Sequence, residues 1–399
     1  MSGMDGGSRE KGAGAAGEGL EADRGAQAPA RPPFLRRLLR SRTVRAAVAA
    51  GTAGALLGAG TVAWRTDSLP VLSHAAVPCW DSFDDVTMEQ LFGGRETRVE
   101  EQALENDPLD LGLSYGQCRI TGYDDGEAAQ QLTVRVHALD GLRGSDARQW
   151  PEEFLTADMV GMGAGLPGMT SASRAWLALP ESCTGPAGDT RAPTVVDVGT
   201  GRAGFDSGHQ GEDRAALTRA VVAAANGVLR DMGCSGAYRV PDRLPELTDR
   251  KAATAQSFCG VKGLTLPTVY REDLTWTRVS GGSAETARVC DAGYKTLGVA
   301  VRMTTVVDPA LSVMFSRDLL RGGTHIRGTK GYGTVNETRA VYAAACQTGR
   351  VIFLIEQKDR PSDGVFDLTR TLLPAYVAAE AERIGCGPEK VTVTTPVRQ

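Results

Sequence analysis

The chain has little histidine: four residues, at positions 74, 137, 209 and 325, lie far apart, and none belongs to an H-E-x-x-H pair. It also has no C-x-x-C pair, whereas residues 112–116, GLSYG, match the G-x-S-x-G pattern formally. The absent motifs are the usual sequence signatures of zincin proteases and zinc fingers, and a single G-x-S-x-G match indicates an α/β-hydrolase only where a strand, a sharp turn and a helix surround it. A dispersed Ser-His-Asp triad stays open, because its members need not be neighbours in sequence. We therefore expect no catalytic residue, no cofactor and no metal site from the motifs.

Two glycine-rich stretches match nucleotide-binding patterns only formally. Residues 163–168 fit G-x-G-x-x-G, but Pro167 lies inside the motif, and a loop replaces the strand and helix that the motif needs. Residues 323–330 end in Thr-Lys, whereas a P-loop needs Lys followed by Ser or Thr. We expect neither stretch to bind a nucleotide.

Acidic side chains outnumber basic ones beyond the first 65 residues. Residues 66–399 contain 34 basic and 43 acidic side chains, a net charge of −9. Nucleic acids and anionic lipids both need a positive footprint on the protein. We therefore expect no nucleic-acid partner for this region.

Residues 46–64, AAVAAGTAGALLGAGTVAW, contain no charge and as a helix would extend about 28 Å, close to the thickness of a hydrocarbon core. Five arginines lie just upstream, at positions 36, 37, 40, 42 and 45. The positive-inside rule then places the N-terminus in the cytoplasm and the C-terminal region outside it. We predict a single-pass signal anchor in the cell membrane.

Two other interpretations of this segment stay open. It could be a cleaved signal peptide with an A-x-A-like site at residues 61–63, although a charged region of 45 residues is long for one. It could be a buried soluble helix, although an all-round apolar helix beside an arginine cluster suits lipid better. Lipidation of Cys79 is disfavoured because residues 76–78 lack the usual preceding pattern.

All eight cysteines follow the predicted anchor, in two sets of four. They are Cys79, Cys118, Cys183 and Cys234, then Cys259, Cys290, Cys346 and Cys386. Three further signatures recur in the same order within each set: Gly-Tyr before a strand-like run, Gly-x5-Arg-Ala, and a helix that begins Leu-Thr-Arg and ends Gly-Cys. The order of these signatures predicts a tandem repeat.

Even numbers of cysteines in an exported segment indicate disulfides, with three possible pairings in each set. Bonds between sequence neighbours, first with second and third with fourth, close the smaller loops, so we favour them. Free thiols in a cytosolic protein are the alternative. A metal cluster is less consistent with the spacing.

Alternating runs such as LTVRVHAL and VAVRM predict strands, and the helix in each set predicts a layer over them. We expect an α+β fold: one transmembrane helix followed by two tandem domains, each an antiparallel sheet plus a helix. The second helix has one extra residue and Pro374, which predicts a bulge, a kink, or a helix that starts there. The expected segments are a disordered cytoplasmic tail (1–45), the transmembrane helix (46–64), a linker (65–78), repeat 1 (79–237), a linker (238–256), repeat 2 (257–390) and a tail (391–399).

Equivalent long loops, residues 140–173 and 309–338, separate the strands of each repeat. The first is apolar (Trp150, Phe154, Leu155, Met159, Met162, Leu166, Met169) and the second basic (Arg317, Arg321, His325, Arg327, Lys330). Long loops are usually functional or disordered. Each loop either packs over its sheet or offers a surface to a ligand or partner.

The layout of residues 36–399, an arginine-flanked anchor followed by cysteine-paired domains, resembles actinobacterial cell-envelope proteins. The repeat unit is also similar to the PsbP/Mog1-type sandwich, which implies hairpins with a long C-terminal helix. These motifs are generic, and they carry over no functional residue.

The leading hypothesis is a noncatalytic membrane-anchored envelope protein whose ectodomain binds an envelope protein or a ligand. An extracytoplasmic hydrolase with a dispersed active site is the alternative. Transmembrane signalling is a third possibility, disfavoured because the cytoplasmic tail is too short for a kinase or a zinc-containing domain.

Overall fold

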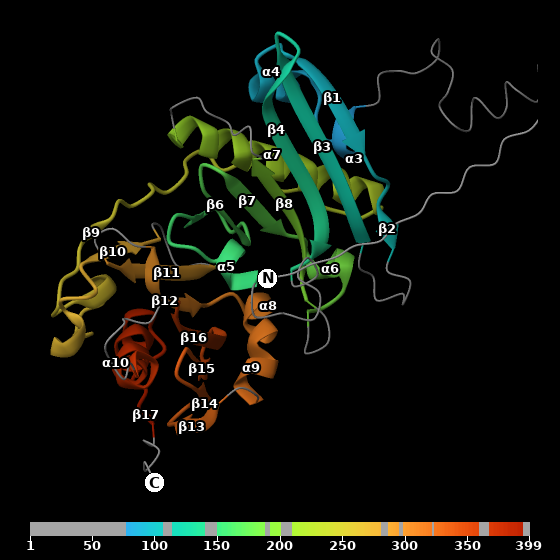
Figure 1. The fold of residues 1–399 in the computed structure, drawn as a ribbon. Coiled ribbons are helices and arrows are strands. Elements are labelled where there is room, and N and C mark those ends of the chain that lie inside the picture. The colour runs from blue at the N-terminus through green and yellow to red at the C-terminus, as the bar shows by residue number, and fades with distance from the viewer. Residues whose placement is uncertain are drawn as a thin grey trace, which may run out of the picture. The chain divides into compact units, whose positions relative to one another are not determined.

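The computed structural model describes residues 77–106, 114–139, 150–187, 192–200, 210–280, 286–294, 298–320, 323–358 and 367–393. They belong to one compact unit, Ala76–Gln399. This unit has the predicted α+β class, with two antiparallel sheets and few helices (Figure 1). The predicted anchor, residues 46–64, and the tail before it lie outside the described residues. Within the described ranges, no helix is both long and apolar enough to cross a membrane.

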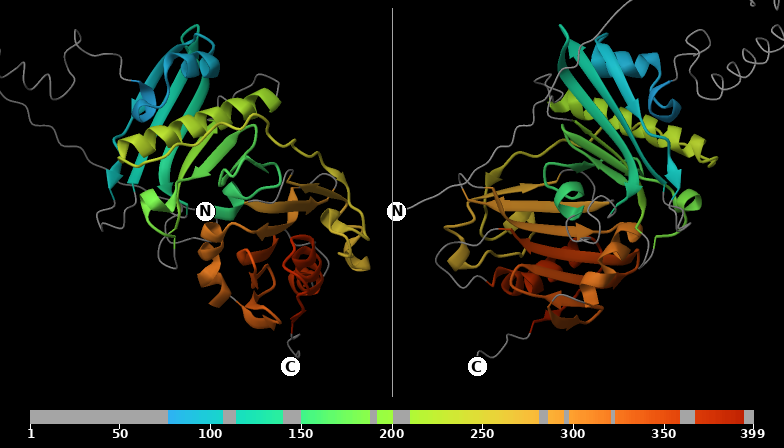
Figure 2. Two further views of the ribbon diagram at one scale, coloured as in Figure 1. Left: turned by 180° about the vertical axis from the view of Figure 1, so that it is seen from behind. Right: turned by 45° about the vertical axis from the view of Figure 1, so that its right-hand side comes forward.

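The first sheet contains eight described strands. In order across the sheet they are β1 (Glu96–Glu101), β3 (Ser114–Asp124), β4 (Glu127–Ala138), β8 (Thr194–Thr200), β7 (Arg174–Ala178), β6 (Gly168–Thr170) and β5 (Val160–Gly161), and β2 (Glu105–Asn106) pairs with β3. The helices of this half are α3 (Pro78–Asp81), α4 (Asp85–Phe92), α5 (Trp150–Phe154), α6 (Glu181–Thr184) and α7 (Gln210–Asp231). The apolar side of α7 covers one face of the sheet, with Leu217, Val221 and Val228 fully buried (Figure 2).

The second sheet contains nine described strands. In order they are β17 (Val391–Thr392), β13 (Thr324–Gly328), β14 (Gly331–Val335), β15 (Arg339–Cys346), β16 (Gly349–Gln357), β12 (Val299–Val306), β11 (Ala287–Gly293), β10 (Trp276–Val279) and β9 (Lys251–Ala252). Its helical segments are η2 (Phe258–Gly260), η3 (Thr268–Tyr270), α8 (Pro309–Ser312), η4 (Val313–Phe315), α9 (Ser316–Leu320) and α10 (Leu368–Arg383). α10 begins at Leu368 and contains Pro374 in its interior. The prediction of a helix that starts at the proline is therefore wrong.

The two sheets have the same strand order. The succession β1-β3-β4-β8-β7-β6-β5 corresponds strand for strand to β10-β11-β12-β16-β15-β14-β13. The registers agree as well. A row of mutually paired residues crosses the first sheet at Cys118, Val134, Val198 and Ala175, and the second at Cys290, Met303, Ile355 and Ala340. Each row therefore joins the second cysteine of a set to the alanine of its Gly-x5-Arg-Ala signature.

The Gly-x5-Arg-Ala signature has the same structural role in both sheets. A Cβ on Gly168 would collide with the Trp176 carbonyl of the facing strand, and a Cβ on Gly333 would collide with the Val341 carbonyl. Glycine is therefore needed for this close approach of two strands.

The arginine of the signature forms an ion pair in both halves. Arg174 Nη1 lies 3.1 Å from Glu153 Oε2, and Arg339 Nη2 lies 2.8 Å from Asp318 Oδ2. In both pairs the acidic residue precedes the arginine by 21 residues and comes from the loop between the hairpins. The two ion pairs therefore tie each loop to its own sheet.

Four disulfides confirm the prediction of disulfide bonding. They join Cys79 to Cys118, Cys183 to Cys234, Cys259 to Cys290 and Cys346 to Cys386, with Cα–Cα distances of 5.3, 5.6, 5.8 and 4.9 Å. These are the pairs between sequence neighbours. Cys79 and Cys259 both adopt a left-handed backbone, with φ of 58° and 57°. Four disulfides indicate an oxidising, extracytoplasmic environment.

The two sheets share a hydrophobic cluster on the faces opposite their helices. Trp150 of α5 packs against Phe315 with ring centroids 5.5 Å apart, and Trp176 and Leu354 belong to the same cluster. The apolar residues of the first long loop are all buried. They are Trp150, Phe154, Leu155, Met159, Met162, Leu166 and Met169. This loop therefore contributes to the core, which is the packing interpretation of its sequence.

A buried ion pair lies beside this shared cluster. Arg302 Nε donates to Asp291 Oδ1 at 2.6 Å, and Arg302 Nη1 donates to the carbonyls of Pro151 and Glu152 at 3.5 and 3.4 Å. The Ala157 amide donates to the same Asp291 carboxylate at 3.3 Å. The second sheet thus binds the backbone of the first long loop through its own charged pair.

Candidate functional site

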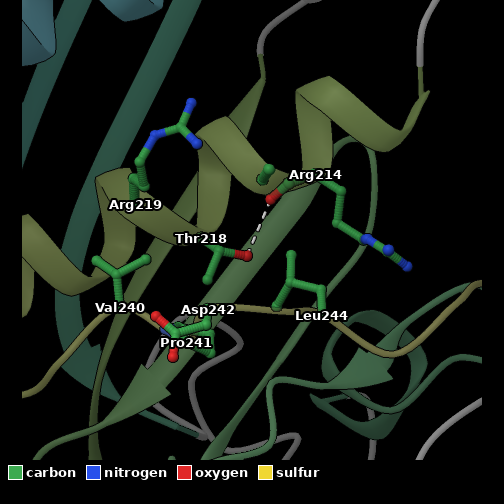
Figure 3. A pocket seen from close by; sticks show the side chains of 8 residues that line it. Arg214, Thr218, Arg219, Val240, Pro241, Asp242 and Leu244 are labelled. Carbon is green, nitrogen blue, oxygen red and sulfur yellow. Dashed lines mark hydrogen bonds between the residues drawn. The ribbon is translucent and has the colours of Figure 1, made fainter.

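The structure has a pocket of about 260 Å³ between α7 and the chain segment that follows it (Figure 3). Eight residues line it: Arg214, Ala215, Thr218, Arg219, Val240, Pro241, Asp242 and Leu244. Half of them lie on the first part of α7, and half belong to the predicted linker, residues 238–256. The linker is therefore one wall of a cavity as well as a connection.

Hydrogen bonds hold the linker over α7. The Tyr238 amide donates to Asn226 Oδ1 at 2.7 Å, and Asn226 Nδ2 donates to the Tyr238 carbonyl at 3.0 Å. The Tyr238 hydroxyl donates to the Ala178 carbonyl at 2.8 Å. Pro241 has no backbone N–H to offer a neighbouring strand. Residues 238–250 form no strand, and the pocket lies between this segment and α7.

The far end of the linker is attached to the second sheet. Arg278 Nε donates to the Thr248 carbonyl at 2.8 Å, and the Thr248 hydroxyl donates to the Val279 carbonyl. The span from Tyr238 to Thr248 is thus fixed at one end by the first half and at the other by the second. Anything bound in the pocket contacts the segment that joins them.

Arg214 is the most unusual group in the pocket wall. Arg214 is 8% exposed. Its Nε and Nη1 atoms have no hydrogen-bond partner in the part of the chain that the structure describes. Burial lowers the pKa of Arg214, and the negative charge of Glu246 opposes this effect. The guanidinium still keeps its charge, because the ordinary pKa of arginine lies far above neutral pH. Two buried guanidinium nitrogens without acceptors are costly for the fold.

The other polar side chains of the pocket wall differ from Arg214 in exposure and in hydrogen bonding. The Thr218 hydroxyl contacts the Arg214 carbonyl at 2.9 Å and the Thr170 hydroxyl at 3.1 Å, so it is already engaged. Arg219 is exposed and leaves α7 in a different direction from Arg214 (Figure 3). Val240, Pro241 and Leu244 make the facing wall largely apolar, with Asp242 as its one acid. The lining of the pocket thus combines an apolar wall with two arginines, one threonine and one aspartate.

Two buried carboxylates elsewhere in the described residues, Asp197 and Glu380, have arginine partners. Asp197 lies between Arg135 and Arg174, each 3.5 Å away, and burial raises its pKa while both arginines oppose the shift. Glu380 accepts from Arg288 at 3.0 Å and from Arg383 at 2.7 Å. These clusters are internally paired and do not line the pocket, so we interpret them as structural.

The histidines singled out by the sequence are not brought together. His137 is buried on β4, its Nδ1 2.6 Å from the Ala138 carbonyl, and His325 is exposed on β13. His74 and His209 lie outside the described residues. Across the ranges that are described, no group of three His, Cys, Asp or Glu side chains is arranged to hold a metal ion.

The other sequence-derived candidates fall on strands and turns. Residues 163–168 form a turn into β6, with Gly163, Ala164 and Gly165 left-handed, and no helix follows as a dinucleotide site requires. In the second long loop, Arg317, His325, Arg327 and Lys330 are exposed, while Arg321 lies outside the described residues. The interpretation of this basic loop as a partner surface stays a prediction.

Sequence reasoning missed both Arg214 and the role of the linker. Arg214 lies three residues before the Leu-Thr-Arg signature, in a helix that extends back to Gln210. The available signal was an arginine on the helix face that also presents Leu217 and Thr218, both buried. A basic residue on a core-facing stripe is a sign of either an ion pair or a ligand site.

Comparison with protein-family models, with curated proteins and with solved structures found no match to this chain.

Proposed function

We propose that this is a noncatalytic, membrane-anchored envelope protein whose extracytoplasmic region binds a ligand or a partner. The pocket beside α7 carries the proposal, because its wall contains a buried guanidinium whose Nε and Nη1 have no hydrogen-bond partner in the described structure. Folded proteins rarely leave a buried charge unpaired unless the site has a use for it. The net charge of −9 over residues 66–399 is in keeping with a partner other than nucleic acid.

The anchor at residues 46–64 and the cytoplasmic N-terminus are part of this proposal. They are supported by the uncharged 19-residue run and the five arginines before it. The mass of the chain isolated from membranes separates the alternatives. An anchor predicts the full 42.0 kDa chain in the membrane fraction. A cleaved signal peptide predicts a mature N-terminus just after Ala63.

We also propose that residues 79–237 and 257–390 are two copies of one domain. The shared strand order, the shared register about the second cysteine and the equivalent ion pairs support this. Unrelated α+β units would have no reason to place an arginine and its acid 21 residues apart at equivalent positions in both. The alternative of an extracytoplasmic hydrolase stays open, and we find no arrangement in the described residues that favours it.

The binding function is tested by asking what the full-length chain carries when it is isolated from its own cells. Native mass spectrometry should detect a bound small molecule, and cross-linking in cells should capture a specific neighbour. Ala215→Trp, which fills the pocket, should remove the small molecule. Asp231→Trp, at the exposed end of α7, should retain it. Finding neither a bound molecule nor a specific neighbour in the unaltered protein would contradict the proposal.

A further inference from the structure

We propose that residues 68–72 bind the open edge of β1 as an added strand. The segment between the predicted anchor and the first disulfide then belongs to the first sheet. Residues 1–76 lie outside the described residues, so the argument starts from the described edge that receives this segment and from its counterpart in the second half. The strand pairing goes beyond the proposed binding function and does not depend on the pocket.

β1 is the last described strand at its edge of the first sheet (Figure 1). The Gln102 amide donates to the Gln117 carbonyl of β3 at 2.8 Å, which fixes the residues of β1 that face β3. By antiparallel alternation, the backbone groups of Thr97, Val99 and Glu101 point away from β3. Val99 is also 37% exposed, which is unusual for an apolar side chain on a sheet. This edge therefore offers backbone donors, acceptors and an apolar side chain to a further strand.

The equivalent edge of the second sheet is occupied by the chain itself. β9 pairs with β10, with Lys251 opposite Thr277, and the Ala253 amide extends the ladder by donating to the Thr275 carbonyl at 3.0 Å. Thr277 corresponds to Val99, because each lies two residues before the residue opposite the second cysteine of its set. Thr277 is only 8% exposed. The second half thus covers with β9 the edge that the first half leaves open among the described strands.

The spacing to the first cysteine identifies the segment that corresponds to β9. Lys251 lies eight residues before Cys259, and Val71 lies eight residues before Cys79. Both cysteines have a left-handed backbone and form the first disulfide of their set, so the chain enters the two halves in the same way. Val71 therefore falls opposite Val99, and this apolar cross-strand pair covers the exposed side chain.

Two further residues of the segment suit this register. Pro70 corresponds to Arg250, which lies between residues that face β10 and therefore turns its own N–H away from the sheet. A proline is accepted on an edge strand where its missing N–H faces away from the sheet. Ser68 corresponds to Thr248, whose hydroxyl donates to the Val279 carbonyl of β10, and serine keeps that hydroxyl.

Together with the proposed anchor, the pairing limits the distance between the first sheet and the membrane. Ser68 lies four residues after Trp64, the last residue of the anchor, a span of at most about 14 Å. Val77, the first described residue, lies thirteen residues after Trp64, a span of up to about 45 Å. The pairing thus holds the β1 edge close to the bilayer, whereas an unpaired tether leaves the extracytoplasmic region free to move away from it.

Hydrogen–deuterium exchange of the full-length chain, measured by mass spectrometry on peptides that cover residues 96–101, tests the pairing. Val71→Pro removes the N–H that faces β1. It should speed exchange of the outward amides roughly 10-fold, the factor expected when a hydrogen bond is lost. Leu72→Pro is the matched control, because the N–H of Leu72 faces away from β1, and it should leave the exchange unchanged. Peptides from β4 should exchange alike in all three proteins.

A cysteine pair provides a second measurement that does not depend on proline. Leu72→Cys with Arg98→Cys should form a fifth disulfide within one chain, because opposed residues that exchange no hydrogen bonds lie about 4.5 Å apart at Cα. Leu72→Cys with Arg119→Cys is the control. Arg119 lies on β3, one strand further in and roughly 10 Å away, so no bond should form. Nonreducing peptide mapping identifies the bonds.

Three results overturn the proposal: fast exchange of the outward amides in the unaltered chain, protection that survives Val71→Pro, or a disulfide of the Leu72→Cys, Arg98→Cys variant that joins two chains. Protection that disappears on dilution identifies a second copy as the occupant, and protection that disappears on purification identifies another protein. Either outcome also overturns it. None of these variants alters a residue that lines the pocket, so failure here leaves the proposed binding function standing.

Discussion

The two halves differ most in the segment that follows the long helix. After Cys386 the chain adds β17 to the edge of the second sheet, and Glu389 accepts hydrogen bonds from Tyr342, Thr329 and Lys330. After Cys234 the corresponding segment contains Pro241, forms no strand and leaves a pocket against α7. The comparison shows how the same arrangement of strands and disulfides accommodates an added edge strand in one half and a pocket in the other.

The halves also differ in how they fill the space between helix and sheet. In the second half Glu380 of α10 accepts from Arg288 on β11 and from Thr305 on β12, and it is fully buried. The positions equivalent by strand register and by the Gly-Cys helix end are Val228, Gly116 and Val136 in the first half. At Gly116 a Cβ would lie only 2.9 Å from the Trp80 ring, which occupies this space. The same frame thus tolerates an apolar filling or an ionic one.

The largest predicted effect comes from removing the buried ion pair between Glu380 and Arg288. Glu380→Ala should destabilise the protein by about 3–5 kcal/mol, because it leaves Arg288 buried without its carboxylate. Val228→Ala, its matched position in the first half, should cost less, roughly 1–3 kcal/mol, because it removes only apolar contacts. Denaturant unfolding measures both. Equal losses would mean that the ion pair has no special weight in the second half.

The next prediction compares how much the disulfide at the end of the long helix stabilises each half. Serine at both Cys183 and Cys234, or at both Cys346 and Cys386, should cost about 2–5 kcal/mol. The loops have sequence separations of 51 and 40, for which chain entropy predicts a difference of only about 0.2 kcal/mol. Unfolding of the two variants should therefore be similar. A difference of several kcal/mol between their unfolding free energies would show that one half depends on this disulfide far more than the other.

A smaller effect distinguishes the equivalent ion pairs. The side chains of Arg339 and Asp318 are both 13% exposed, whereas those of Arg174 and Glu153 are 23% and 28% exposed. Double-mutant cycles with alanine should give a coupling of roughly 0.5–3 kcal/mol, larger for the more buried pair because water screens it less. A larger coupling for Arg174 with Glu153 would contradict this order.

Much of the frame shared by the halves is visible in the sequence. The cysteines, the Gly-x5-Arg-Ala signature and the Leu-Thr-Arg helices recur in one order, and alternation in runs such as LTVRVHAL identifies β4. These features are local or depend on spacing, so a single chain displays them. The acid 21 residues before each arginine was equally visible, but only the folded loop shows that Glu153 and Asp318 meet those arginines.

The pocket could not be predicted because it depends on where the linker lies. Proline and mixed charge in residues 238–256 indicate a connection, and nothing in that composition states that Val240 and Leu244 face α7. The same holds for the first long loop, whose apolar residues suit an exposed partner surface as well as a core. Burial of Trp150 depends on contact with Phe315, which is 165 positions further along the chain.

The smallest predicted effect concerns the attachment of the linker at alkaline pH. Burial raises the pKa of Tyr238 to about 12, and its hydroxyl donates to the Ala178 carbonyl. Because the folded pKa lies above the ordinary value of 10, the stability linked to the protonated phenol is complete below pH 10 and is lost between about pH 10 and 12.

Tyr238→Phe removes this titration, so the stability of the unaltered protein relative to the variant should fall across that window. Tyr342 and Tyr376 of the second half also have raised pKa values, but both are present in the two proteins compared and cancel. Thermal unfolding of both proteins at several pH values is the measurement. A constant difference between pH 10 and 12 would mean that the Tyr238 hydroxyl does not hold the linker over the pocket.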